Sequence, residues 1–208
     1  AQDGKHMDVY RMAKGLGDLN TAITALHYEM AAKPSDALKD SLASMYFLAG
    51  NNFQAITLAE QLLEKDPDDV RMLEMTAIAY QNAGAIKESL QRYEKLFRQT
   101  KEPYHLYQIV TNQFNLKRYG ECVASINALL GMEGVNEEQV AINVNQRQRQ
   151  KVSLAAAAWN VMGVLQRDQK EFDKAIQSFQ KALDIQEDFV LAQGNLEATR
   201  EAMEGGEA

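Results

Sequence analysis

The sequence predicts an all-α fold in which helical hairpins stack into a solenoid. A small residue followed directly by an aliphatic one recurs five times, as Ala22-Ile23, Ala55-Ile56, Ser89-Leu90, Cys122-Val123 and Ala175-Ile176. The spacings are 33, 34, 33 and 53 residues, and the last equals one period plus about twenty inserted residues. A fixed period of this size indicates an array of one supersecondary unit.

A turn signal stands five residues before each small residue, at Gly17, Gly50, Gly84, Lys117 and Lys170. Glycine at such a position ends a helix in the left-handed conformation at little cost. In four copies an apolar residue follows just inside the next helix, at Leu19, Ile86, Tyr119 and Phe172. We therefore expect two helices joined by a short turn in every period.

The second helix of each period carries an apolar stripe at helical spacing, which is clearest at Leu90, Tyr93, Leu96 and Phe97. Pro67 ends one such helix, and Asp68 and Asp69 place acids at the positive end of the next. A last helix over 190–204 has apolar residues on one side and charges elsewhere, as expected of a capping helix.

These residues resemble the tetratricopeptide repeat (TPR) family, whose pattern is W-x2-L-G-x2-Y, G, A-x3-F, A, P. The best copy has Trp159, Gly163, Phe172, Ala175, Phe179 and Ala182. Further copies start at Asp36 and Val70, and weaker ones near Asp3 and Pro103. The resemblance implies a right-handed superhelical solenoid of about five pairs. Its parts would be pairs one to four (3–131), an insertion (132–153), pair five (154–189) and the capping helix (190–204), in one continuous domain.

The insertion fits no repeat. Val140, Ile142 and Val144 alternate with smaller or polar residues, and Val152 and Leu154 do so beyond a polar stretch. Alternating β-branched residues favour two short extended segments that fold against each other. The alternative is a helix that starts at Glu137 and runs into the alanine-rich segment at 155–158. The insertion either carries specificity or is a tolerated connection between repeats.

Composition excludes several functional classes. Lys and Arg number 22 against 29 Asp and Glu, so the net charge is −7, and an acidic surface disfavours nucleic acid. No apolar run is long enough to span a membrane.

The single Cys122 excludes an internal disulfide and is expected to be a buried packing thiol. The histidines, which do not converge in the repeat, are expected on helix surfaces or edges, and no metal or cofactor is expected. No catalytic motif is recognisable, so we expect a protein that is not an enzyme.

The chain opens with Ala1-Gln2-Asp3, a combination typical of a new N-terminus left by signal peptidase. We therefore expect an exported or periplasmic bacterial protein. The alternatives are a boundary introduced by cloning, with native sequence starting near Met7, and a cytoplasmic location.

The resemblance also implies a site, because the first helix of each TPR pair lines the concave face. Position by position, that face would carry Arg71, Glu74, Ile78 and Gln81; Tyr104, Tyr107, Thr111, Phe114 and Asn115; Asn160, Val164 and Arg167; and Asp40, Ser44 and Phe47. Family members that bind chaperone tails clamp a terminal carboxylate with Lys and Asn, and Asp40 and Ser44 stand at the corresponding places here.

An aromatic, amide-bearing surface of this kind suits an extended peptide or protein segment, with Tyr104, Tyr107 and Phe114 at its centre. The alternative is that these aromatic residues pack between repeats. The expected function is a protein–protein interaction scaffold, and the alternative is a homo-oligomerisation element built by end-to-end contacts, most readily at the N-terminal end.

Overall fold

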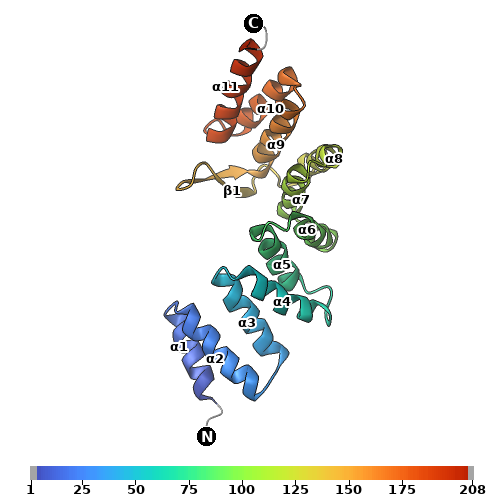
Figure 1. Ribbon diagram of the computed structural model, residues 1–208. Helices are drawn as coiled ribbons and strands as arrows, with labels where there is room; N and C mark the ends of the chain where they lie inside the picture. Colours follow the sequence, from blue (N-terminus) through green and yellow to red (C-terminus); the bar gives the residue numbers. More distant parts are fainter. Residues whose placement is uncertain (1–3, 206–208) are drawn as a thin grey trace. The chain divides into compact units, whose positions relative to one another are not determined.

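In the computed structural model, residues 4–205 form eleven α-helices and one two-stranded sheet (Figure 1). The chain divides into two compact units, Ala1–Leu96 and Phe97–Ala208. The expected start of the first pair at Asp3 lies outside the described residues. Among the helices described, none is both long enough and apolar enough to cross a bilayer.

Unit 1 is a run of antiparallel helical hairpins. Its helices are α1 (Lys5–Gly15), α2 (Leu19–Ala32), α3 (Asp36–Leu48), α4 (Asn52–Leu63), α5 (Val70–Asn82) and most of α6 (Ile86–Thr100). Each helix from α1 to α4 packs on the next along the chain, and α3 also contacts α5. This contact brings the first helices of two successive pairs side by side.

Unit 2 continues the same hairpin pattern and contains the insertion. Its elements are α7 (Pro103–Asn115), α8 (Tyr119–Leu130), β1 (Gln139–Asn143), β2 (Arg149–Ser153), α9 (Leu154–Asp168), α10 (Phe172–Ile185) and α11 (Val190–Gly205). Helix α9 contacts α7, α8, α10 and α11, so the helices on the two sides of the insertion still pack together. The predicted all-α fold of helix pairs, a final helix and a non-helical insertion is confirmed.

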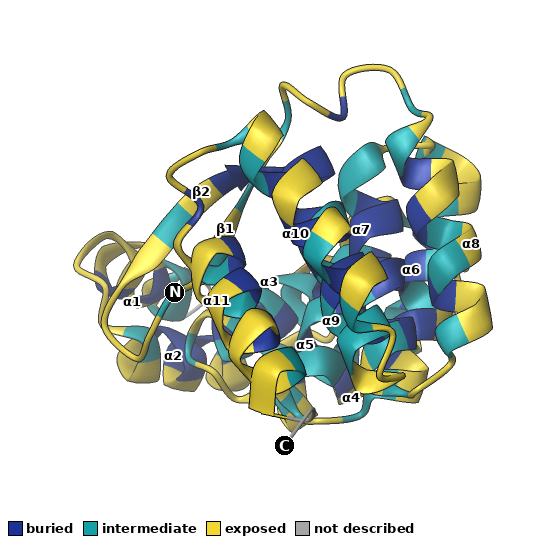
Figure 2. Ribbon diagram, turned by 90° about the horizontal axis from the view of Figure 1, so that it is seen from above, coloured by how far each residue is buried: buried dark blue, intermediate teal, exposed yellow. Residues whose placement is uncertain are grey.

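The repeated small residues are fully buried, as expected of positions where two helices pack against each other. Ala22, Ala55, Ser89, Cys122 and Ala175 all have an exposed fraction of 0%. Most helices are buried along one side and exposed along the other, whereas α7 and α9 are buried or half-buried at nearly every position (Figure 2). A short amphipathic helix is marginal alone in water, so this packed side supplies most of its stability.

The turns inside the pairs share one backbone conformation. Gly17, Gly50 and Gly84 have φ of 74°, 76° and 78°, and Lys117 and Lys170 have φ of 56° and 62°. The turn positions predicted from the sequence are therefore confirmed, including those where lysine replaces glycine. The two lysines adopt a conformation that costs an L-residue about 1–2 kcal/mol.

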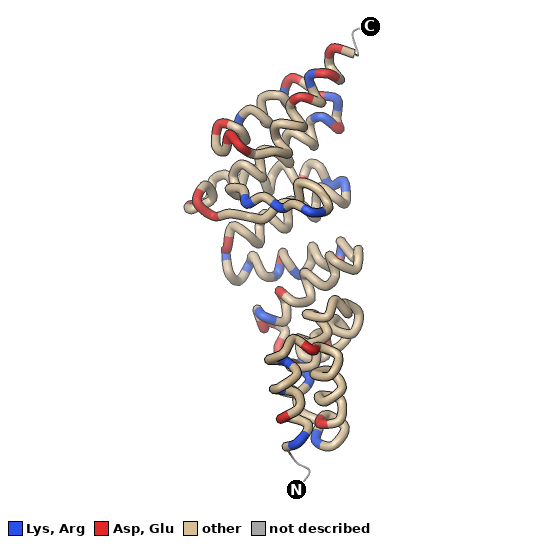
Figure 3. The backbone as a smooth tube through the Cα atoms, turned by 90° about the vertical axis from the view of Figure 1, so that its left-hand side faces the viewer, with Lys and Arg blue, Asp and Glu red and all other residues tan. Residues whose placement is uncertain are grey.

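The insertion is a β-hairpin, so the alternative of a continuous helix from Glu137 is wrong. The antiparallel register pairs Gln139 with Ser153, Ala141 with Lys151 and Asn143 with Arg149. Helix α9 begins only after Ser153, whose side chain accepts a hydrogen bond from the Ala156 N–H at 3.5 Å. Figure 3 colours Lys and Arg blue, including those of the hairpin.

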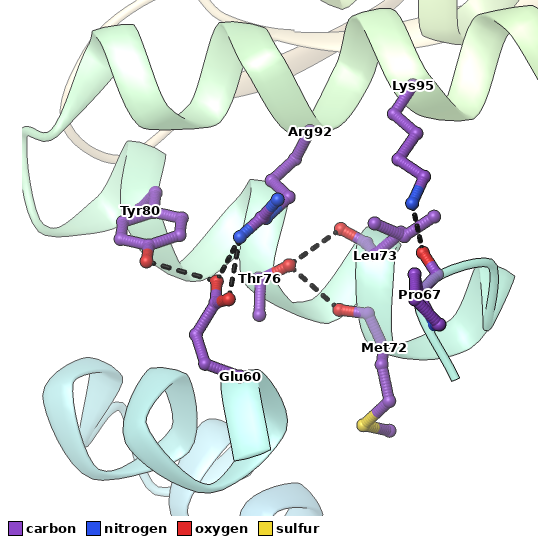
Figure 4. A network of polar contacts seen from close by, with 8 residues as sticks. All are labelled: Glu60, Pro67, Met72, Leu73, Thr76, Tyr80, Arg92 and Lys95. Atoms are coloured by element: carbon purple, nitrogen blue, oxygen red, sulfur yellow. Dashed lines mark hydrogen bonds and ion pairs between the residues drawn. The ribbon is translucent and has the colours of Figure 1, made fainter. Parts of the chain in front are cut away.

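A half-buried ion pair joins three helices of unit 1 (Figure 4). The Arg92 guanidinium of α6 lies 2.6 Å from both carboxylate oxygens of Glu60 in α4. The Tyr80 hydroxyl of α5 donates to the same carboxylate at 3.1 Å. The Nη2 nitrogen of Arg92 makes both contacts, and these charge-assisted hydrogen bonds help to hold α4, α5 and α6 in register.

Candidate functional site

A hollow formed by first helices lies between α3 and α5 in unit 1. We call it the first-helix groove; it is lined by Ser44, Phe47, Leu48, Arg71, Glu74, Met75 and Ile78, with a volume of about 310 Å³. On each helix the lining residues are three or four positions apart, which puts them on one face. The groove therefore follows directly from helical periodicity and the contact between α3 and α5.

The groove combines an apolar floor with a charged rim. Phe47 and Ile78 are half-buried, Met75 is buried, and Leu48 leaves 62% of its surface exposed. On the rim, the Arg71 guanidinium forms an ion pair with Asp40 and donates to Ser44 Oγ at 3.5 Å. The hydrogen bond to Asp40 raises the pKa of Arg71 above its ordinary value. Asp40 and Ser44 thus hold the rim arginine rather than a carboxylate ligand.

Local structure at the start of α5 orients Arg71. The Asp69 carboxylate caps the helix by accepting from the Met72 N–H at 3.0 Å. The cap starts the helix at Val70 and places Arg71 in its first turn. A guanidinium has five N–H donors, and these two partners leave some of them available for a bound carbonyl or carboxylate.

Three of the four residues predicted on α5 therefore meet in the groove, while Gln81 lies half-buried further along the helix. Sequence reasoning missed Leu48 and Met75. Their signal was present, because Leu48 follows Ser44 by four positions and Met75 precedes Ile78 by three.

The residues predicted on α7 lie in a different environment. Eight of its thirteen residues are buried, and Tyr107 leaves only 6% of its surface exposed. This burial, with a smaller contribution from Tyr104, raises the pKa of Tyr107 well above its ordinary value. Tyr107 is thus a packing residue and not the centre of an open surface, which corrects its predicted placement.

The other α7 residues are engaged to different degrees. Tyr104 is half-buried, and the ring of Phe114 lies 5.9 Å from that of Tyr119 in α8. The half-buried Thr111 donates from its hydroxyl to the carbonyl of Gln108 at 3.0 Å, and Asn115 is exposed.

The expectation that all histidines lie at surfaces or edges is wrong for His105. It is 2% exposed, and its Nδ1 lies 2.7 Å from Thr100 Oγ1. Its position in the packed first turn of α7 explains the difference.

The residues predicted on α9 contact the last helices of unit 2. Asn160 is buried, and its Oδ1 accepts from Asn195 in α11 at 3.0 Å. Asn195 in turn accepts from Arg167 at 3.2 Å, and Val164 packs against the cluster around Phe179. Asn160 is therefore a packing residue too, whereas Arg167 remains half-buried at the surface.

A second hollow in unit 1, of about 380 Å³, lies between α2, α3 and α4 and includes Phe53, which is 74% exposed. Two of its polar side chains, His27 and Tyr46, hydrogen-bond to each other, with His27 Nε2 2.6 Å from the Tyr46 hydroxyl. The first-helix groove has its polar atoms on the rim and its apolar atoms on the floor, which is the arrangement that suits a peptide.

Comparisons with known proteins agree with this architecture. The tetratricopeptide repeat family matches residues 41–69 and 156–189. No curated protein matches the sequence. Among solved structures, YrrB, described as a TPR protein with an unusual peptide-binding site, is similar in fold, with a TM-score of 0.68 at 14% identity, covering 91% of this chain and 89% of that one.

Two MamA structures are also similar in fold. One has a TM-score of 0.67 at 14% identity and covers 88% of this chain and 90% of its own. The other, from Desulfovibrio magneticus RS-1, has a TM-score of 0.63 at 14% identity and covers 81% and 85%. Residues 41–69 and 156–189 of this chain thus match the tetratricopeptide repeat family, and the chain shares its fold with solved TPR structures.

Proposed function

We propose that this protein is a non-enzymatic scaffold whose first-helix groove binds an extended segment of a partner protein. The TPR fold generally serves as an interaction scaffold, and its members bind proteins or peptides. The observation that carries the proposal is the exposed apolar floor beside a rim that keeps free donors on Arg71.

The chemistry of the groove defines the bound segment. Leu48 and Phe47 offer apolar area for one or two aliphatic or aromatic side chains, whose burial drives binding. Arg71 offers donors to main-chain carbonyls or to an acidic side chain of the same segment. An extended peptide with alternating apolar and polar residues satisfies both requirements.

The experiment selects peptides from a displayed library against the intact chain and measures their affinity by fluorescence anisotropy. Phe47→Ala should weaken the selected peptides by about tenfold or more, since a central aromatic anchor contributes about 2 kcal/mol or more. Phe53→Ala is the matched control, because Phe53 is exposed in the other hollow of the same unit. Equal weakening by both variants, or by neither, would remove the site from the groove.

A separate observation supports homo-oligomerisation as the second candidate. Val9 and Met12 of α1, and Leu16 directly after it, are 36%, 61% and 77% exposed and follow one another at helical spacing. Terminal repeats of solenoids usually present a polar outer face, so an apolar one favours a contact with a second copy. Sedimentation velocity over a concentration series tests this candidate: Met12→Glu should abolish self-association, and a monomeric native chain rejects it.

A further inference from the structure

The two edges of the insertion hairpin are treated differently by the rest of unit 2. The Gln186 side chain covers the outer edge of β2, accepting from the Ser153 N–H at 3.0 Å and donating to the Lys151 carbonyl at 3.1 Å. Gln150 anchors the same strand at the start of α11, donating to the Asp188 carbonyl at 2.6 Å and accepting from the Val190 N–H at 3.0 Å. The edge of β2 is thus occupied by its own chain.

The outer edge of β1 is open. Hydrogen bonds from the Val144 N–H to the Gln148 carbonyl and from the Leu154 N–H to the Glu138 carbonyl, each 2.9 Å, set the register. In an antiparallel pair alternate residues face the partner strand, so the N–H and C=O groups of Gln139, Ala141 and Asn143 point away from β2. All three residues are exposed.

Within residues 4–205, the outward backbone groups of β1 have one side-chain partner, the Arg149 guanidinium, which lies 3.4 Å from the Ala141 carbonyl oxygen. Natural proteins usually block a free edge with a charge or proline on the edge strand, or with a covering segment. Here β1 itself reads Gln-Val-Ala-Ile-Asn and carries neither a charge nor a proline. The edge is therefore competent to pair with another strand.

The hairpin is also the basic part of an acidic chain. No Asp or Glu occurs from Gln139 to Arg167, although the chain as a whole has a net charge of −7. Arg147, Arg149 and Lys151 are exposed within this stretch. The register places Lys151 directly opposite Ala141, so its side chain starts on the same face of the hairpin as that of the edge residue.

From these observations we infer that the outer edge of β1 pairs with an extended acidic segment of a partner protein, which adds a third strand to the hairpin. Main-chain hydrogen bonds to Gln139, Ala141 and Asn143 would hold the segment, and Arg149 and Lys151 would select carboxylates on its exposed face. This site lies in unit 2 and is independent of the first-helix groove in unit 1.

The test uses two short labelled peptides, one alternating Glu with Val and the other Lys with Val, with fluorescence anisotropy as the readout. The Glu peptide should bind the intact chain at least about tenfold more tightly than the Lys peptide, and added salt should weaken it. Equal binding of the two peptides would overturn the assignment of an acidic partner.

Ala141→Pro separates strand pairing from simple charge attraction. It removes the outward N–H but no hydrogen bond within the hairpin, and an edge strand tolerates proline at such a position. It should lower affinity for the Glu peptide by about tenfold, whereas the matched Ala141→Val, which keeps the N–H, should stay within about twofold of native. Equal affinity of both variants and the native chain overturns strand pairing.

Amide hydrogen exchange provides a measurement that needs no variant. Adding the Glu peptide to the native chain should slow exchange at Ala141 and its outward-facing neighbours and leave the already paired Ile142 unchanged; no change at Ala141 overturns the proposal. Because an alternating acidic peptide also meets the requirements of the first-helix groove, the Ala141→Pro comparison is repeated in the Phe47→Ala background, where Ala141→Pro should still lower affinity by about tenfold. If the native chain instead self-associates and Ala141→Pro abolishes it, the occupant is a second copy and the inference fails.

Discussion

Gly163 in α9 is a position where one added methyl group should destabilise the protein. A Cβ built on this residue would lie 2.5 Å from Cε1, 2.7 Å from Cδ1 and 2.8 Å from Cζ of Phe179 in α10. Carbon atoms in favourable contact are about 3.5–4.0 Å apart, so the ring would have to move by about 1 Å. Phe179 is 0% exposed and packs in a cluster with Ala175 and Leu196, which leaves the ring little room to move.

Two opposing terms set the size of the effect for Gly163→Ala. Alanine is the better helix former by about 1 kcal/mol, which favours the variant. Overpacking of a tight core costs about 1–3 kcal/mol, and three ring contacts below 3.0 Å put this site in the upper part of that range. The net expectation is a loss of about 1–2 kcal/mol, or a fall in Tm of about 2–8 °C for a chain of this size.

Thermal and urea unfolding followed by circular dichroism measure the change. Gly194→Ala is the matched control, because Gly194 also lies inside a helix but has no atom within 4 Å of an added Cβ. It should gain about 0.5–1 kcal/mol from helix propensity alone. If Gly163→Ala proves as stable as the native chain while Gly194→Ala shows its gain, the close approach of α9 and α10 is not limiting and the packing argument fails.

Two other predictions concern the turns and the thiol. Lys117→Gly should raise the free energy of unfolding by about 0.5–1 kcal/mol, because glycine adopts the left-handed conformation without strain. Gly50→Ala, which has no atom near its added Cβ, should lower the free energy of unfolding by about 1 kcal/mol because alanine is strained in that conformation. Unfolding curves in which both variants move the same way would contradict this. Burial raises the pKa of Cys122 from 9.0 to about 12, so near pH 8 its reaction with a disulfide reagent should be at least about 100-fold slower in the folded than in the unfolded chain. The same shift means that this group's contribution to stability is full below pH 9 and falls as the pH rises toward 12; a fast-reacting folded thiol would refute both statements.

The helix pairs could be predicted from the sequence because a repeated contact leaves a repeated trace. Wherever two helices approach closely, only a small residue fits, so the same restriction recurs once per period at Ala22, Ala55 and Ala175. The turns could also be predicted from a few neighbouring residues, since a residue in the left-handed conformation follows each first helix. Even Lys117, which breaks the glycine pattern, keeps its position in the period and its positive φ.

The site was less accessible to sequence reasoning because periodicity shows which residues share a face, not whether that face is open. Helix α7 is buried on most of its surface, so Tyr107 packs inside the unit, whereas Glu74, which also lies ten residues before the turn of its repeat, lines a groove. The hairpin had a comparable ambiguity. Its alternation favoured strands, but the contact that holds β2 comes from Gln186, 33 residues after Ser153, and local sequence does not reveal it.

The insertion consists of a base that belongs to the core and a tip that does not. At the base, Val135, Val152 and Leu154 are buried, and the Ala155 N–H donates to the Val135 carbonyl at 3.1 Å. The tip from 143 to 149 is exposed apart from Val144, which is half-buried. Because the contacts of α9 with α7 and α8 are kept, the tip can change without loss of packing. Asn143 at the end of the open edge, and the basic Arg147 and Arg149, therefore lie where new recognition costs the fold least.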